Sequence, residues 1–450
     1  MATSITTTAP LSTRRERWAW YLYDFGNSAY AAVVLLAVYS AYFQGTVVGG
    51  AEGSRLWGLS VGIAMLVVAV TSPILGAIAD FSASKKRLLA FYTVMTVIFT
   101  AGLFFATPGQ VAIGMGFFIL AEIGYRSAQV FYDALLPEIA APEEMGRISG
   151  NGWAVGTAGG IVCLLIALPL IVLQQQGVLQ MSGDLVVRIT LVITAVFFAL
   201  SAIPLFLWLP ERAKAKTLPA GENYLSMAFK QLGKTIRTAR SFREFLKFML
   251  AYLIYNDGII MALDFAAIIG AVLFGMNQQD LIIFVILVQA TNVVGAYIFG
   301  ILMDRMGGKP SLVGSLILMI AVVLGLYFAQ TRTAFFIIGA LAGIAMAGAQ
   351  SVSRTMVAVF APPGQSAEFF GFFAVAGRTS SFIGPAVYGW IAAEMALYYA
   401  AQGQTVVLAE QSGQRIAILS IAAFLLVGLG LLLFVNEEKA RETAVAETGD

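Results

Sequence analysis

Long apolar segments recur along the whole chain and are separated by shorter polar segments. They do not alternate with polar residues as barrel strands do, and each is close to or longer than the roughly 20 residues of helix that cross a bilayer. The pattern therefore predicts an all-α polytopic membrane protein with twelve transmembrane helices. The expected ranges are 18–43, 55–80, 88–106, 110–136, 148–174, 187–209, 245–275, 281–303, 311–330, 333–358, 369–398 and 414–435.

The first apolar segment is interpreted as a retained helix and not as a secretory signal. Residues 1–17 are polar, and the run 18–43 is longer than the roughly 7–15 apolar residues of a signal-peptide core.

The distribution of Lys and Arg predicts the orientation in the membrane. With a cytoplasmic N-terminus, 20 basic residues fall in the inside segments and 4 in the outside loops (Arg55, Arg188, Arg332 and Arg415). Cytoplasmic segments carry the excess of basic residues in membrane proteins. Both termini are therefore expected on the cytoplasmic side of the cell (inner) membrane.

A long polar connection divides the chain into two six-helix halves. Within it, Leu225, Phe229, Leu232 and Ile236 have helical spacing and predict an amphipathic helix on the membrane surface, although a linker that is merely soluble would also suffice. The charged tail is expected to be disordered. The expected organisation is an N-terminus at 1–17, the first half at 18–209, a cytoplasmic linker at 210–244, the second half at 245–435 and a tail at 436–450.

Three groups of residues recur in the same order in both halves. Gly76 and Asp80, followed by a basic run, return as Gly300 and Asp304 at an offset of 224. The other groups are Gln129, Pro142 and Gly150 with Gln350, Pro363 and Gly371, and Tyr23 and Gly26 with Tyr255 and Gly258. Each match is weak alone, but together they indicate parallel internal repeats related by an axis along the membrane normal.

Composition supports this reading and excludes several functions. Hydrophobic residues make up 59% of the chain and charged residues 12%, about half the charge of a typical soluble protein. The chain has no His and a single Cys, Cys163, so it offers neither histidine metal sites nor an internal disulfide. A net charge of +2 does not indicate a nucleic-acid partner. No cofactor or metal is expected.

The repeated Gly-x-x-x-Asp motif with a basic run resembles the signature loop of the major facilitator superfamily. Within it, the segment Trp20 to Tyr30 and the segments Phe131 to Pro137 and Ser149 to Trp153 resemble the vacuole-effluxer branch, the autophagy-related protein 22-like proteins. The first loop departs from the pattern at Phe81 and Ala83, whereas the second is intact. The resemblance implies the major facilitator fold, a cavity lined by helices one, four, seven and ten, and amino-acid efflux.

Charged residues inside the apolar segments indicate a solute cavity independently of any family. A charge in hydrocarbon costs at least about 2.5–3.5 kcal/mol, so it normally faces a protein interior or an aqueous cavity. These charges fall mainly on helices one, four, seven and ten. The candidate substrate and proton cavity residues are Asp24, Asn27, Glu122, Arg126, Gln129, Asp257, Asp264, Gln350 and Arg378.

Helix four carries the densest polar face. Glu122, Arg126, Gln129 and Asp133 are spaced i, i+4, i+7 and i+11, so they share one side of the helix. A buried ion-pair stripe that only joins helices is the alternative interpretation. For Asp24 the alternative is a carboxylate that reaches the cytoplasmic interface.

Four residues are candidates for gating. By the resemblance, Asp80 lies near the start of helix eleven and Asp304 near that of helix five, where helix N-termini favour a carboxylate. Asp133 and Arg354 are repeat-equivalent at an offset of 221, and opposite charges there are expected to bridge when the cytoplasmic side closes. Pairing of each charge within its own half is the alternative.

Together these features predict a secondary active transporter and not an enzyme. We expect a monomer in membrane lipid that moves a small polar solute, an amino acid or similar zwitterion, by alternating access, with protons as a candidate coupling ion. An organic-anion/proton symporter and a non-transporting assembly factor or receptor are the alternatives. A primary pump is disfavoured because the chain lacks a P-loop.

The orientation can be tested with single cysteines in a Cys163→Ala background. Cysteines at Ser4, Thr217 and Thr448 are expected to resist an impermeant thiol reagent added to intact cells, because these positions are predicted to be cytoplasmic. A cysteine at Gln402 is expected to react. The reverse labelling pattern would contradict the predicted topology.

Overall fold

The computed structural model describes residues 12–82, 84–140, 142–212, 242–361 and 382–446, together with five isolated positions between 369 and 377. Its described residues are almost entirely helical. Eleven of the described helices are long and apolar enough to cross a membrane.

The N half comprises residues 14–208. Its first helix combines α1 (Arg14–Tyr30), η1 (Ala31–Ala37), α2 (Tyr39–Tyr42) and η2 (Phe43–Val48). The remaining elements are α3 (Gly50–Ser82), α4 (Lys85–Gly102), η3 (Leu103–Phe105), α5 (Val111–Ala134), α6 (Leu136–Ile139), α7 (Pro142–Gln175) and α8 (Gly183–Trp208).

The C half comprises residues 243–433 and repeats this order. Its elements are α10 (Arg243–Phe274), α11 (Gln278–Met306), α12 (Gly308–Phe328), α13 (Arg332–Phe360), α15 (Ile383–Ala401) and α16 (Val406–Leu433). A further helix, α17 (Glu437–Ala446), follows it. The expectation of a disordered tail is therefore wrong for residues 437–446, whose Glu437 binds the start of α12 as described below.

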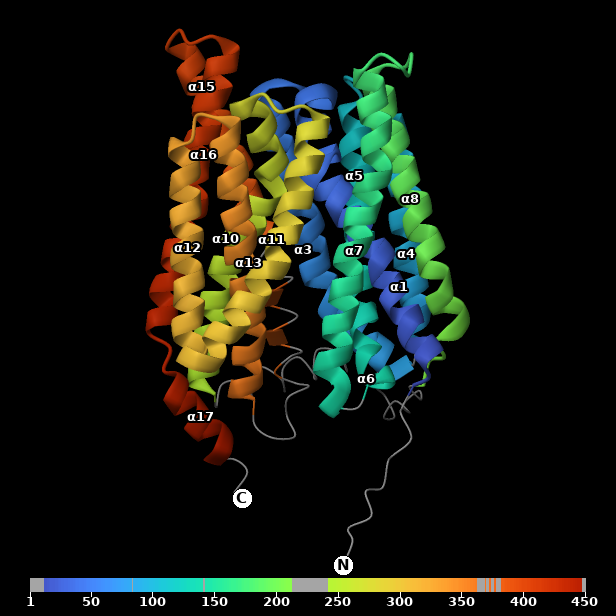
Figure 1. The fold of residues 1–450 in the computed structure, drawn as a ribbon, viewed down its shortest axis with the longest axis vertical. Helices are drawn as coiled ribbons and strands as arrows, with labels where there is room; N and C mark the ends of the chain where they lie inside the picture. The colour runs from blue at the N-terminus through green and yellow to red at the C-terminus, as the bar shows by residue number, and fades with distance from the viewer. Residues whose placement is uncertain are drawn as a thin grey trace, which may run out of the picture.

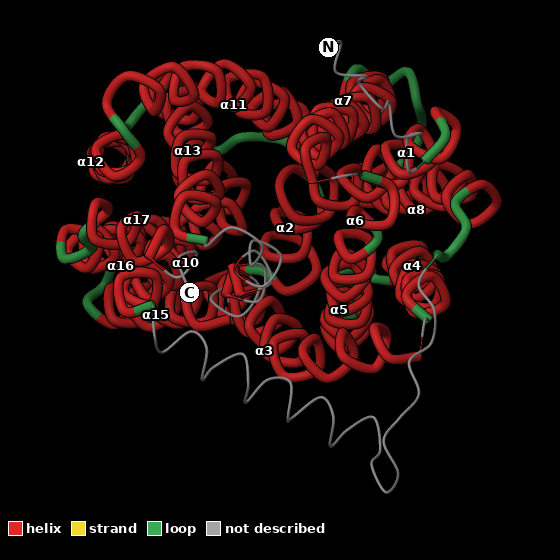
Figure 2. The backbone as a smooth tube through the Cα atoms, turned by 90° about the horizontal axis from the view of Figure 1, so that it is seen from below, coloured by secondary structure: helices red, strands yellow, loops and turns green. Residues whose placement is uncertain are grey.

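Figure 1 shows the two halves side by side, with the beginning of α1 and the helix α17 at the same end of the molecule. We call this the inner end and the opposite end the outer end. Viewed from below, the halves meet along two seams, where α3 packs against α15 and α7 packs against α11 (Figure 2). The outer part of the first helix also packs against α10.

The first helix is irregular in its outer half. The segments Ala31–Ala37 and Phe43–Val48 are wound as π-helix, with a bend at Val38 between them. Wide turns of this kind disturb the regular i to i−4 ladder and are frequent at functional sites. The side chain of Gln278, at the start of α11, donates to the Val38 carbonyl at 3.3 Å, so the bend is stabilised from the other half.

Glycines let α7, the fifth transmembrane helix, approach α1 closely. Gly152, Gly156 and Gly160 of α7, spaced four residues apart, form a small-residue face that packs against α1. Gly159 lies beside the same face, and a Cβ atom there would overlap the main chain of Phe25. Small residues at such interfaces let two backbones come together without a cavity.

The sequence repeat is visible in the packing of the first helix of each half. Gly26 of α1 lies against Phe198 and Ser201 of α8, and its repeat mate Gly258 of α10 lies against Phe424 and Leu425 of α16. In both halves, therefore, the repeated glycine lets the sixth transmembrane helix, α8 or α16, pack closely against the first.

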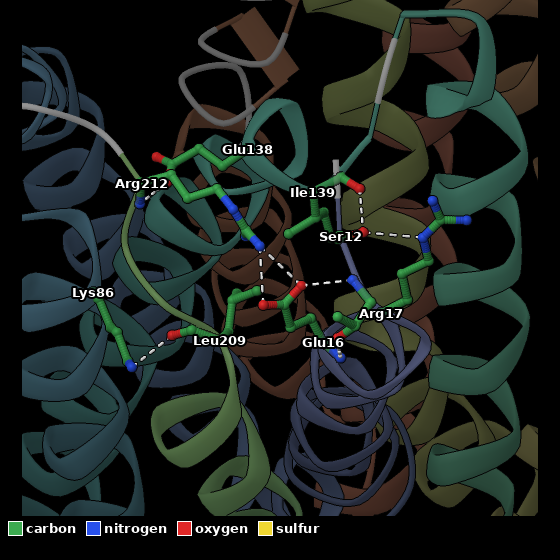
Figure 3. Close-up of polar contacts among 9 residues, drawn as sticks. Ser12, Glu16, Arg17, Lys86, Glu138, Ile139, Leu209 and Arg212 are labelled. Carbon is green, nitrogen blue, oxygen red and sulfur yellow. Dashed lines mark hydrogen bonds and ion pairs between the residues drawn. The ribbon is translucent and has the colours of Figure 1, made fainter. Parts of the chain in front are cut away.

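At the inner end of the N half, charged side chains tie four segments together (Figure 3). Both oxygens of Glu16, in the first turn of α1, accept from the Arg212 guanidinium at 2.9 Å. The main-chain N–H of Arg212 donates to Glu138 of α6 at 2.8 Å, and Lys85 lies 3.3 Å from Glu138. Basic residues that set the expected orientation thus also hold the helix ends together.

Lys86, near the start of α4, binds the end of α8, and Lys309 binds the end of α16 in the same way in the other half. The Lys86 ammonium donates to the carbonyl of Leu209, just after α8, at 2.6 Å (Figure 3), and its N–H faces Glu211 at 3.4 Å. The carbonyl groups at a helix C-terminus carry partial negative charge, so a lysine there is favourable.

Lys309 does the same in the C half. Its ammonium donates to the carbonyls of Leu433 and Val435 at 2.8 Å and 2.7 Å, and its N–H donates to Glu437 at 2.8 Å. The third transmembrane helix of each half, α4 or α12, is therefore bonded to the end of the sixth, α8 or α16.

The predicted amphipathic helix of the linker lies outside the described residues.

We expect Gly159→Ala to lower the unfolding temperature of the detergent-solubilised protein by several degrees, because the added methyl group separates α7 from the main chain of α1. Gly150→Ala is the matched control, since a Cβ at Gly150 of the same helix meets nothing within 4 Å. That control should be neutral or stabilising, because Ala has the higher helix propensity. Equal unfolding temperatures for the two variants would contradict the close packing.

Candidate functional site

Buried charged side chains from both halves lie within electrostatic range of one another. Glu122 and Arg126 come from α5, and Asp264 comes from α10. The Arg126 Nε atom donates to Glu122 Oε1 at 2.7 Å, and the Glu122 side chain is 0% exposed. Asp264 is 2% exposed, and its carboxylate is attracted by Arg126 and repelled by Glu122. We call Glu122, Arg126 and Asp264, together with Tyr30, the central cluster.

The central cluster has unused hydrogen-bonding capacity. Among the described residues, Glu122 Oε2, Asp264 Oδ2 and the Tyr30 hydroxyl have no hydrogen-bond partner, although all three atoms are buried. The Tyr30 hydroxyl faces the Glu122 carboxylate and is at most a weak hydrogen-bond donor to it, so the capacity that Tyr30 leaves for a ligand is its oxygen lone pairs. Buried polar atoms without partners are costly and call for an explanation, and a ligand-binding role is one.

Aromatic rings surround the cluster. Tyr30 stacks on Tyr125 with ring centroids 4.6 Å apart, and the Arg126 guanidinium lies 5.2 Å from the centre of the Tyr125 ring. Trp57 of α3 packs against Phe118, one helical turn before Glu122, at 4.5 Å. The cluster is thus polar in the middle and aromatic around it, as small-molecule sites often are.

Trp57 of α3 also forms a hydrogen bond to α10 of the other half. It is 0% exposed, and its indole N–H donates to the main-chain carbonyl of Asp264 at 2.9 Å. A helix of the N half therefore holds the segment of the C half that carries a cluster carboxylate. Sequence reasoning missed Trp57 and Tyr30, because an uncharged aromatic residue in an apolar helix gives no signal of its contacts.

The remaining side-chain links between the halves among the described residues lie at the outer end. Arg55 and Glu394 form an ion pair at 2.6 Å. Gln414 donates to Ser54 at 2.6 Å and accepts from Tyr388 at 2.8 Å. Within the described part of the chain, no side-chain hydrogen bond or ion pair joins the halves at the inner end. The Arg55–Glu394 pair and the bond from Gln414 to Ser54 hold the two halves together at the outer end.

Asp257 has a different environment from the central cluster. It is 3% exposed, and both of its oxygens face the N–H of Gly384, at 3.1 Å and 3.0 Å. Gly384 is the second residue of α15, so the carboxylate caps the N-terminus of that helix, where exposed amides and the helix dipole favour negative charge. The neighbouring Asn256 donates to the Gly377 carbonyl at 3.4 Å. Asp257 thus positions α15 relative to α10.

Asp24 lies nearer the inner end, against the glycine face of α7. A Cβ atom at Gly156 would collide with its carboxylate and with Ser28. Its carboxylate interacts with the side chains of Asn27 and Ser28 and is influenced by two more distant charges, Asp133 of α5 and Arg354 of α13. An arginine of the C half therefore acts on a carboxylate of the N half.

Both residues of the predicted gating pair, Asp133 and Arg354, are exposed. The described ion pairs do not include one between these two residues. Gln350 and Asp304 are also exposed, whereas Gln129 is partly buried and donates to the Tyr125 hydroxyl at 3.1 Å. Arg378 and the side chain of Asp80 lie outside the described part of the structure.

A surface recess of ≈ 440 Å³ lies elsewhere, at the outer end, and is lined by residues that include Tyr42, Gln174, Asn277 and Gln278. It contains none of the predicted cavity residues. The candidate site is therefore the packed central cluster and not this recess.

The protein family whose profile matches the chain is described as vacuole effluxer Atg22 like, with matches at residues 57–146 and 143–445. The uncharacterized MFS-type transporter YxiO of Bacillus subtilis is 28% identical over 437 residues, covering 96% of this chain and 97% of YxiO. Autophagy-related protein 22-1 of Penicillium rubens is 24% identical over 322 residues, covering 67% of this chain. The chain spans about half of that fungal protein (50%).

Solved structures show the same fold. A bacterial homolog of the human lysosomal transporter Spinster, in an inward-facing and unoccupied conformation, superposes with a TM-score of 0.70 at 15% identity, covering 96% of this chain and 98% of the other. A D-xylose-proton symporter gives 0.64 at 13% identity, covering 95% and 98%. The expected major facilitator fold is confirmed. The matched family and the bacterial relative are described as effluxer and transporter, which also agrees with the expectation of a non-enzyme.

A charge swap tests the gating pair. Asp133→Ala and Arg354→Ala are each expected to impair solute transport in proteoliposomes, because the inner closed state loses one side of a bridge. Asp133→Arg combined with Arg354→Asp should restore most of the rate. Desolvation offsets much of the attraction in such a pair, so the single variants should slow transport only several-fold.

A folded swap variant no more active than the weaker single variant would contradict the bridge. In that case each charge acts within its own half or on the solute. The influence of both residues on Asp24 makes a shared role with that carboxylate the next hypothesis.

Proposed function

The chain belongs to the vacuole effluxer Atg22-like family, and on that premise we propose that it is a secondary transporter that moves an amino acid or a similar small zwitterion across the inner membrane by alternating access. The observation that carries the proposal is the central cluster. It consists of charged groups from both halves, it is buried, and part of its hydrogen-bonding capacity is unused. A site shared between the halves is the arrangement that alternating access requires.

The links at the outer end support a cycle in which the halves rock about the cluster. Opening outward would break the Arg55–Glu394 pair, the bond from Gln414 to Ser54 and the bond from Trp57 to the Asp264 carbonyl. The ion pair is partly exposed and the other two bonds are buried, and each of the three is worth on the order of 1 kcal/mol. They therefore offer a modest barrier that differential solute binding can overcome.

Proton coupling is proposed to act through Asp257 first, then Glu122 and Asp24. A charged carboxylate binds the amide of Gly384 and the N-terminus of α15 more strongly than a neutral carboxyl group does. Protonation of Asp257 would therefore loosen α15, which forms one of the two seams between the halves. This links a proton to the movement that opens the outer side.

The alternatives have less support. An organic anion needs an available arginine at the site, whereas Arg126 is engaged by Glu122. A non-transporting receptor or assembly factor has no use for unpaired polar atoms in the membrane interior, which lower stability without an occupant. The amine of a zwitterion, by contrast, suits the unpaired carboxylate oxygens of Glu122 and Asp264.

The test is uptake into proteoliposomes across a panel of amino acids, nucleosides, sugars and organic acids, with and without an imposed pH gradient. We expect saturable uptake of at least one amino acid. The matched control is Arg55→Ala combined with Glu394→Ala, which should still transport, because it weakens only the links at the outer end. Uptake confined to organic anions would support the symporter alternative, and no uptake of any solute would reject transport.

Asp257→Asn is expected to abolish uphill uptake driven by a pH gradient while leaving exchange between compartments of equal pH largely intact, because the amide cannot carry the proton. Glu122→Gln and Asp24→Asn are the next candidates in that order. Full uphill uptake in all three single variants would reject proton coupling through these carboxylates.

A further inference from the structure

Building on the proposed transport function, we propose that the central cluster recognises an ammonium group, which binds between Glu122 of the N half and Asp264 of the C half beside the Tyr30 hydroxyl. The specificity determinant is then the amine of the solute, and its carboxylate is dispensable for binding. Primary amines without a carboxylate are therefore a further class of ligand for this chain.

The charge balance of the cluster is the first support. When both are ionised, Glu122 and Asp264 bring two negative charges, and Arg126 brings one positive charge that is already bonded to Glu122. A cationic group of charge +1 makes the cluster neutral. Neutrality is strongly favoured at a buried site, because an uncompensated charge in a medium of low dielectric constant is costly.

The unused atoms have the right chemistry for this group. Glu122 Oε2 and Asp264 Oδ2 are acceptors, and the Tyr30 oxygen can also accept. Tyr30 and Glu122 are 0% exposed and Asp264 is 2% exposed, so the unused oxygens are in the interior. An ammonium group has three N–H donors and no acceptor, which matches three acceptor oxygens. A solute carboxylate would instead face oxygens of its own charge.

The surroundings of the cluster also favour a cation. The Tyr30 and Tyr125 rings stack at 4.6 Å, and the Trp57 ring packs against Phe118 above the cluster. The faces of such rings attract cations within about 6 Å. The Arg126 guanidinium lies 5.2 Å from the centre of the Tyr125 ring, so this ring already makes one cation–π interaction.

Binding of an ammonium group by Glu122 and Asp264 would also affect the transport cycle. The two carboxylates belong to different halves, and the described hydrogen bond from the N half to Asp264, donated by Trp57, reaches its main-chain carbonyl and not its carboxylate. An ammonium group bound by both carboxylates draws the halves together around the solute. Amine binding thus favours an occluded arrangement, which a ligand held by one half alone would not.

The experiment measures thermal stability of the purified full-length protein in nanodiscs with three chloride salts at equal ionic strength. Methylammonium has three N–H donors, tetramethylammonium has the same charge and none, and Na⁺ is an alkali ion. We expect methylammonium to raise the unfolding temperature by a few degrees over both others. Asp264→Asn and Glu122→Gln should each reduce this rise at least several-fold, and Tyr30→Phe should reduce it partly.

Glu410→Gln is the matched control, since Glu410 lies at the outer end of α16 away from the cluster, and it should keep the full rise. If Glu122→Gln does not fold because Arg126 loses its partner, Asp264→Asn and Tyr30→Phe carry the test. Equal stabilisation by Na⁺ would assign the cluster to an alkali ion. Equal stabilisation by tetramethylammonium, or none by methylammonium, would overturn the proposal.

The same protein in proteoliposomes separates this inference from the proposed function. For the best-transported amino acid, its decarboxylated amine should compete for uptake within about ten-fold of the parent, and its N-acetyl derivative should not compete. Amine-dependent stabilisation without uptake of any solute would reject transport and keep the ammonium site. Uptake blocked equally by the N-acetyl derivative would keep transport and reject the ammonium site.

Discussion

A charged group in the hydrocarbon interior of a membrane must be paired or shielded, and the architecture of this protein follows from that constraint. Glu122 is bonded to Arg126 one turn along α5, and Asp257 is bonded to the amide at the start of α15. Asp264 has a carboxylate oxygen that no described group satisfies. The interior is thus neutralised almost completely by local contacts, and the residual imbalance is concentrated where the two halves meet.

At the inner end, basic residues pair with helix ends and carboxylates and so contribute to stability there. Lys86 and Lys309 bind the carbonyls that follow α8 and α16, and Arg212 binds Glu16 at the start of α1. These bonds join helices within each half. The described polar links between the halves, by contrast, run from Ser54, Arg55 and Trp57 to α10, α15 and α16, and from Gln278 to Val38.

Close approach of helices is provided by glycines and not by polar bonds. Gly159 admits the main chain of α1 within the N half, and Gly58 of α3 lies against the carbonyl of Pro385 in α15 across the seam. Packing without hydrogen bonds has no directional partner to break, so such an interface can separate and re-form.

The sequence by itself determined the helical class, the positions of the spans, the two repeated halves and the fact that charge gathers on helices one, four, seven and ten. Hydropathy and spacing are properties of single segments, so they can be read locally. Only the tertiary structure decided that Glu122 shares a site with Asp264, 142 positions away, while Asp257 caps α15. Those partners depend on how each helix is rotated and how closely the halves approach, which packing between distant segments sets.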